Sequence, residues 1–163
     1  MMLFSENRTC GTCQKCCEGW LTGHLVVEGV VDCTMKPGTP CTQLGPKGCA
    51  IYPIRPVSPC RTFSCGWLVP NSPLPDDYRP DQLGVIFVPI KWRGKRAWVL
   101  VPAGNDPSED LKAQMRAYTQ SSGEPHMIKL PDRVLCYGVP EFQHSMLDLE
   151  RRGVSPWDAG EFT

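Results

Sequence analysis

The sequence predicts an α+β fold in one domain: a small, irregular, cysteine-rich half followed by a small antiparallel sheet with two helices. Three observations predict it. Nine of the ten cysteines lie within residues 10–65. The 17 prolines and 15 glycines favour turns over long regular elements. After residue 83, apolar residues recur first with the period of strands and then with that of helices. We therefore expect a cysteine-cluster region at 8–68 and an α+β part at 83–155.

Charge and hydropathy exclude several classes of protein. Lys plus Arg and Asp plus Glu both number 17, so no net charge favours nucleic acid or an acidic partner. No segment approaches the roughly 18–20 apolar residues of a membrane span, and the N-terminus has no apolar stretch of signal-peptide length. We therefore expect a cytoplasmic protein without membrane contact, whose reduced thiols serve as ligands before they form disulfides.

The first four cysteines form the run C-x-x-C-x-x-C-C, which comprises Cys10, Cys13, Cys16 and Cys17. A C-x-x-C turn brings two sulfurs to one side, where they can face one metal ion. The overlapping C-x-x-C-x-x-C pattern also wraps iron–sulfur clusters. Adjacent residues usually point apart. Cys16 and Cys17 therefore either serve two different centres, or one of them is only a small buried side chain.

Four more cysteines follow at irregular spacings, namely Cys41, Cys49, Cys60 and Cys65. Together the two sets supply eight thiolates, enough for two four-thiolate sites or for one cluster and one structural zinc. Cys33 is a ninth candidate. Cys136 lies in an apolar run and is expected in the core. The histidines are isolated, and we interpret them as ordinary polar or core residues: His24, His126 and His144. The alternative for His24, seven residues after Cys17, is a role as ligand. We therefore predict that bound metal holds the first half of the chain together.

Residues 41–65 read C…L…G-C-x-I-Y-x-x-R-P-x…C-R-x-F-x-C. Joined to the C-x-x-C-x-x-C-C run, this pattern resembles the bacterial cysteine-cluster family of zinc- or iron-chelating proteins, which is described by its CxxCxxCC motif. A related motif occurs in flagellin lysine N-methylases. The resemblance covers residues 10–66 and implies eight ligands: Cys10, Cys13, Cys16, Cys17, Cys41, Cys49, Cys60 and Cys65. It implies no reaction, and residues 57–59 place one residue more before Cys60 than the family pattern has.

Two arginines of this pattern, Arg55 and Arg61, stand among the cysteines. A four-thiolate zinc site and an iron–sulfur cluster are both anionic. Guanidinium groups nearby offset that charge and donate hydrogen bonds to sulfur. We therefore expect both arginines to lie beside the metal or cluster. The alternative is that they are solvated on the surface.

The proline-rich residues 69–82 are expected to form a loop wrapped over the domain rather than a linker. Residues 85–90 and 97–101 predict a β-hairpin around a short basic turn. Their near-continuous apolar character indicates cover on both faces of the sheet. Pro89 favours an edge strand or a bulge, because proline cannot donate to the ladder.

Asp106 as N-cap and Pro107 at the first helical position predict a helix that runs to about residue 121. Its apolar stripe comprises Leu111, Met115 and Tyr118. Residues 126–130 and 133–137 predict a second hairpin. A last helix is expected over 140–152, capped by a glycine. It would bury Phe142, Met146 and Leu149.

The predicted function is coordination of zinc or an iron–sulfur cluster by clustered cysteine thiolates. The alternative is an iron–sulfur redox protein or enzyme, which the flagellin N-methylase resemblance extends to a methyltransferase-related role. Binding to nucleic acid through the basic turn of the hairpin is disfavoured, because a solvated basic tip is commoner. No phosphate-binding, dinucleotide-binding, nucleophile-elbow or zinc-protease motif occurs. A protein partner remains open.

Overall fold

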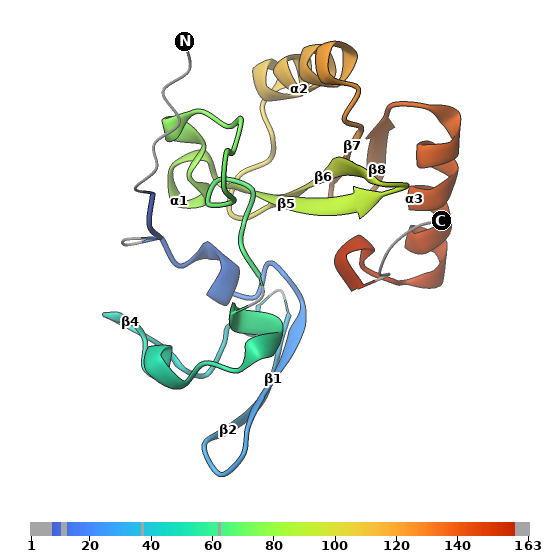
Figure 1. Ribbon diagram of the computed structural model, residues 1–163. Coiled ribbons are helices and arrows are strands. Elements are labelled where there is room, and N and C mark those ends of the chain that lie inside the picture. The colour runs from blue at the N-terminus through green and yellow to red at the C-terminus, as the bar shows by residue number, and fades with distance from the viewer. Residues whose placement is uncertain (1–7, 11–12, 37, 62, 159–163) are drawn as a thin grey trace. The chain divides into compact units, whose positions relative to one another are not determined.

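The computed structural model describes residues 8–10, 13–36, 38–61 and 63–158 (Figure 1). The chain divides into two compact units, residues 1–86 and 87–163, which are described separately. Helices and strands both occur, so the α+β class is confirmed. In the described ranges, no helix is long and apolar enough to cross a membrane.

Two short hairpins occur in the first unit. Strands β1 (Gly23–Val27) and β2 (Val31–Met35) pair antiparallel, as do β3 (Leu44–Gly45) and β4 (Gly48–Cys49). The sequence did not indicate β1 and β2. One reason is that the inward face of β2 carries a cysteine, Cys33, between two buried apolar residues, so the alternation is incomplete.

The first unit also contains short turns of helix. These are η1 (Lys15–Cys17), η2 (Tyr52–Ile54), η3 (Val57–Arg61), η4 (Asp76–Tyr78) and α1 (Pro80–Leu83). Helix α1 ends at Gly84, whose φ of 75° places it in the left-handed region that favours glycine.

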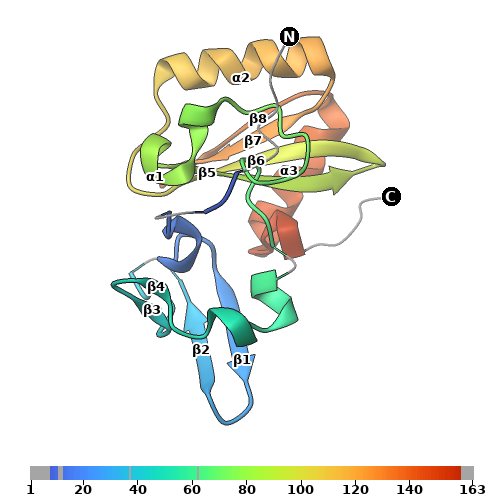
Figure 2. The ribbon, with the colours of Figure 1, turned by 60° about the vertical axis from the view of Figure 1, so that its left-hand side comes forward.

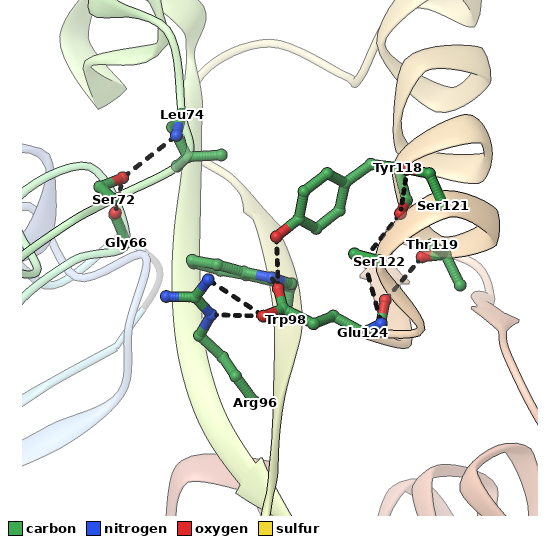
Figure 3. A network of polar contacts seen from close by, with 10 residues as sticks. All are labelled: Gly66, Ser72, Leu74, Arg96, Trp98, Tyr118, Thr119, Ser121, Ser122 and Glu124. Carbon is green, nitrogen blue, oxygen red and sulfur yellow. Dashed lines mark hydrogen bonds and ion pairs between the residues drawn. The ribbon is translucent and has the colours of Figure 1, made fainter. Parts of the chain in front are cut away.

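The proline-rich segment after the cysteines wraps around Trp67, which is buried. The indole Nε1–H of Trp67 donates to the carbonyl oxygens of Pro75 and Asp76, both at 3.1 Å. Arg8 closes the loop, because its guanidinium donates to the Trp67 and Leu74 carbonyls at 3.0 and 2.8 Å. Ser72 donates to the Gly66 carbonyl at 2.6 Å (Figure 3). These bonds hold the segment that follows the last cysteine of the cluster region.

The second unit is built on a four-stranded sheet in the order β5-β6-β7-β8. Its strands are β5 (Val85–Trp92), which starts at the end of the first unit, β6 (Lys95–Pro102), β7 (His126–Lys129) and β8 (Val134–Tyr137). Both hairpins that the sequence predicted are present. Pro89 lies in β5, at the edge of this sheet, which is one of the two positions that the sequence predicted for it.

One pair of strands in this sheet is parallel, namely β6 and β7, with Trp98 opposite His126. Parallel neighbours need a crossover, and helix α2 (Glu109–Ser122) supplies it. Helix α3 (Pro140–Arg152) follows β8. Figure 2 shows α2 on one side of the sheet and α3 on the other. This explains why successive residues of β5 and β6 are buried.

The start of α2 differs from the sequence prediction. The N-cap is Ser108 rather than Asp106, and the helix begins at Glu109. The Ser108 hydroxyl accepts the N–H of Leu111 at 3.1 Å, which satisfies one of the free donors of the first turn. Asp106 stands too far before the helix to reach that donor. The predicted stripe of α3 is confirmed, because Phe142, Met146 and Leu149 are all buried.

Aromatic rings and one partly buried carboxylate organise the second unit. The rings of Trp92 and Phe142 meet edge to face, with centroids 5.5 Å apart. Glu124 accepts the indole N–H of Trp98 at 2.8 Å, the Tyr118 hydroxyl and the Arg96 guanidinium (Figure 3). Burial acts to raise the pKa of Glu124, but these hydrogen bonds outweigh it and lower the pKa. The carboxylate therefore stays charged.

His126 is fully buried in this unit and is stacked on Tyr137. Thr119 donates its only hydroxyl proton to the Glu124 carbonyl at 2.8 Å. It therefore accepts from the Nδ1–H of His126, at 2.6 Å. The imidazole Nε2 has no hydrogen-bond partner in the described part of the chain. Burial lowers the pKa of His126 to about 4, and the charge of Arg116 makes a smaller contribution in the same direction.

We expect the second unit to lose stability in acid because of His126. The unfolded chain binds this proton near pH 6.5 but the folded protein only near pH 4, so stability falls as the pH drops between these values. The loss from pH 7 to pH 4.5 should be about 2.5 kcal/mol. Urea unfolding at both pH values tests it. His126→Gln should remove most of this difference, whereas the exposed control His144→Gln should keep it. Equal pH dependence in both variants would contradict the assignment.

Candidate metal centre

All ten cysteines are free thiols. Hydrogen bonds of the backbone connect the two cysteine sets of the sequence. The N–H of Cys13 donates to the Cys10 carbonyl at 2.8 Å, which closes the first turn, and η1 then carries Cys16 and Cys17. The N–H of Cys41 donates to the Cys17 carbonyl at 2.9 Å. The start of the second set is thus attached to the end of the first.

Four cysteines lie together around Cys16, and we name them the first thiol group: Cys10, Cys13, Cys16 and Cys65. Burial raises the pKa of Cys16 well above its ordinary value, and the charge of Cys65 contributes next, ahead of the nearer cysteines in sequence. Burial also raises the pKa of Cys65, with further contributions from Cys10 and Cys13. A cysteine nearly fifty residues further along the chain thus acts electrostatically on the first run.

Four other cysteines form the second thiol group: Cys17, Cys41, Cys49 and Cys60. Burial raises the pKa of Cys17 to about 11, and the charges of Cys41, Cys49 and Cys60 contribute next. The same group packs against one apolar cluster, in which Cys41 is buried among Leu25, Val31, Met35 and Ile51. Each group therefore holds four thiols contributed by distant parts of the sequence.

Cys16 and Cys17 are adjacent but face different groups. The thiol with the largest effect on Cys16 is Cys65, whereas the thiol with the largest effect on Cys17 is Cys41. Both are residues of η1, and consecutive side chains on one turn are expected to point in different directions. Of the alternatives that the sequence left open, the arrangement favours one centre for each residue.

Backbone N–H groups lower the pKa of two of the cysteines. The N–H of Leu68 donates to the Cys65 carbonyl at 2.9 Å. The N–H groups of Leu68 and Trp67 act on the pKa of Cys65, and that of Gln43 acts on the pKa of Cys41, in each case against the larger effect of burial, which raises the pKa. Such donors stabilise the thiolate form, which is the form that binds metal.

Arg55 lies near both groups, because its charge lowers the pKa of Cys10 in one and of Cys60 in the other. Tyr52 holds it there: the guanidinium lies 3.7 Å from the ring centroid, and Nε–H donates to the Tyr52 carbonyl at 3.0 Å. Arg61, which the sequence also indicated, is exposed on η3.

The sequence did not indicate Arg79, whose charge lowers the pKa of Cys10. Its guanidinium is held by Asp81, with Nη2 donating to Oδ2 at 2.7 Å. No spacing signal marks this residue, because the fold alone brings it near Cys10.

Cys60 lies in η3, a single turn of π-helix. The N–H of Arg61 donates to the carbonyl of Pro56, five residues earlier, at 3.2 Å. Such single π-turns are rare and occur frequently at functional sites. The turn packs beside β1, where a Cβ added at Gly23 would lie 3.6 Å from Pro59. Cys60 itself packs against the apolar cluster that contains Cys41.

The remaining candidates lie elsewhere. His24 is on the exposed side of β1, where it contacts Thr34 at 2.9 Å and Asp32 at 3.2 Å, so its partners are not thiols. Cys136 lies on β8 in the second unit and is partly buried rather than fully buried. Burial raises the pKa of Cys136 to about 11, and the charge of Glu150 makes a smaller contribution in the same direction.

The chemistry of the donor sets fits a soft metal, since each group offers four sulfurs with hydrogen-bond donors or arginine charge beside them. The sulfurs do not converge on one point: within the described ranges, no three His, Cys, Asp or Glu side chains lie close enough together to hold a metal ion. Comparisons with protein-family models, with curated proteins and with solved structures give no match.

Proposed function

We propose that this chain is a metal-binding protein that coordinates zinc or an iron–sulfur cluster in two four-thiolate centres. The first thiol group would hold one centre and the second thiol group the other. One observation carries the proposal: the eight cysteines that the sequence marks as ligands gather in the first unit, where Cys17, Cys49 and Cys60 pack against the apolar cluster that contains Cys41 and the charges of Cys65, Cys13 and Cys10 act on Cys16. Four thiolates complete a tetrahedral zinc site or the ligands of one cluster, which is typical of a structural centre.

Electrostatics supports the same conclusion. Four thiolates held in a partly apolar environment repel one another, and a bound cation removes that repulsion. The complex of one zinc ion with four thiolates keeps a net negative charge, which Arg55 lies close enough to offset for both groups.

The second candidate is an iron–sulfur redox protein. The first thiol group favours it, because Cys10, Cys13 and Cys16 have the C-x-x-C-x-x-C spacing that wraps a cluster. Cys65 would be the fourth ligand, and its burial at 5% exposure would shield the cluster from water. The methyltransferase-related alternative rests on the resemblance alone.

Anaerobic purification followed by metal analysis, acid-labile sulfide analysis and an absorption spectrum tests the proposal. Zinc without colour would identify thiolate zinc centres, and iron with equimolar sulfide and broad charge-transfer absorption would identify a cluster. Cys13→Ser and Cys60→Ser should each lower the metal content, whereas the control Cys136→Ser should not. Wild-type protein without metal, or equal loss in all three variants, would contradict the proposal.

A further inference from the structure

Two exposed apolar surfaces lie on the first unit. We name them the turn surface, residues 26–32, and the helical surface, residues 52–61. Seven large apolar side chains are exposed in the described part of the chain, and five of them belong to these surfaces: Val26, Val30, Tyr52, Ile54 and Val57. Single exposed apolar side chains are ordinary, but side chains that gather in this way mark interaction sites.

The turn surface is acidic and hollowed. It is formed by the turn between β1 and β2, at the free end of the hairpin in Figure 2. Residues 26–32 line an open hollow of about 340 Å³. Asp32 contacts the imidazole of His24 at 3.2 Å, whereas Glu28 has no ion-pair partner among the described residues. Residues 16–35 include no lysine or arginine, so nothing in this stretch of sequence offsets the acidic charge.

The helical surface is basic and presents an exposed aromatic ring. The guanidinium of Arg55 lies 3.7 Å from the centroid of the Tyr52 ring. Val57 begins η3 and Arg61 ends it, and Arg61 forms no ion pair within the described ranges. Residues 33–75 include no aspartate or glutamate. Tyrosine and arginine are enriched where interfaces gain most of their binding energy. The helical surface therefore complements the turn surface in charge, and its ring complements the hollow.

The two surfaces lie at opposite ends of β1. The turn surface includes Val27, the last residue of the strand. Pro59 of the helical surface packs at Gly23, the first residue, where an added Cβ would lie 3.6 Å from it. Four residues of strand separate these ends by about 13 Å. Two hairpins placed side by side in opposite directions would therefore bring each turn surface onto the helical surface of the other chain.

We propose that these surfaces form the interface of a homodimer, in which the turn surface of each copy binds the helical surface of the other. A second copy is the occupant because one chain supplies both complementary surfaces. The contact is isologous, so a two-fold axis closes it and leaves neither surface free. Tyr52 of one copy would enter the hollow of the other, and Arg61 would face Glu28.

The dimer should be weak. The two surfaces together comprise fewer residues than the roughly 20–30 per side of a stable interface, so we expect a dissociation constant on the order of 1 μM. Sedimentation equilibrium of the full chain, in reductant to exclude disulfide-linked species, measures it. Wild type should change from monomer to dimer as its concentration rises, and added salt should weaken the dimer.

Charge reversal identifies the two surfaces. Glu28→Arg and Arg61→Glu should each raise the dissociation constant about tenfold or more, because the symmetry places each reversed charge in both contacts. A mixture of the two variants should form a heterodimer of wild-type affinity. In one of its contacts the reversed turn surface meets the reversed helical surface, and in the other both surfaces are unchanged. Recovery on mixing would also show that both variants fold.

A matched pair of variants tests the apolar contact. Val30→Ser should raise the dissociation constant about threefold or more, because the side chain no longer buries apolar area. Val139→Ser in the second unit should leave it unchanged, although Val139 is as exposed as Val30, at 51% against 50%.

Three results would overturn the inference: wild type that stays monomeric at every concentration, a mixture of the charge variants without heterodimer, or equal effects of Val30→Ser and Val139→Ser. The inference does not use the thiol groups. Metal analysis of the same samples separates the two proposals, because a monomer that binds metal leaves the proposed function intact.

Discussion

Chelation of the bound metal is expected to unfold the first unit, residues 1–86, while the second unit, residues 87–163, keeps its fold. The apolar cluster of the first unit is small, and five cysteines pack in it or against it. Binding of a structural zinc contributes about 10–16 kcal/mol in small metal-dependent domains. This is as large as the whole stability of an ordinary domain, about 5–15 kcal/mol. The cluster cannot replace it.

The second unit has a core that needs no metal. Trp98, Phe142 and Met127 are each less than 2% exposed, and the carboxylate of Glu124 is fully hydrogen-bonded within the same unit. Hydrogen exchange measured by mass spectrometry, before and after chelation, tests the difference. Amides of β1 and β2 should lose protection, and amides of β6 and β7 should keep it. Unchanged protection in β1 and β2 would show that metal does not hold the first unit.

Replacing Cys16 alone or Cys17 alone with serine should remove the metal from different centres. Cys16→Ser should remove the metal of the first thiol group, and Cys17→Ser that of the second, because the two side chains face different partners. Each variant should keep about half of the wild-type metal, and the double variant almost none. A missing thiolate lowers affinity strongly, since serine is a poor ligand for a soft metal.

Alkylation of the thiols that bind no metal shows which centre has lost its metal. In Cys17→Ser, Cys41 and Cys49 should become reactive while Cys13 and Cys65 stay protected, and in Cys16→Ser the pattern should reverse. Cys136→Ser is the matched control, because it lies in the second unit and should leave both patterns unchanged. The same alkylation pattern in Cys16→Ser and Cys17→Ser would mean that all eight cysteines belong to one centre.

Local patterns predicted the second half well. The strands of the β5–β6 hairpin, the helix over residues 140–152 and the glycine after it follow from periodicity and capping, which involve only near neighbours. The predicted N-cap of α2, Asp106, was wrong by two residues. Asp106 and Ser108 are both good N-cap residues, and only the backbone path selects Ser108. The parallel pairing of β6 and β7 depends on where α2 packs, which no local pattern encodes.

For the site, the sequence by itself determined the candidate groups: eight clustered cysteines, the two arginines Arg55 and Arg61, and an irregular first half. Only the tertiary structure decided which cysteines act on one another, because Cys65 affects Cys16, and Cys60 affects Cys17, across long stretches of chain. It also decided that Arg79 acts on Cys10 and that Cys33 packs against the same apolar cluster as Cys60. Spacing along a chain limits which sulfurs can meet. Which of them do meet depends on the path of the backbone between them, and packing determines that path.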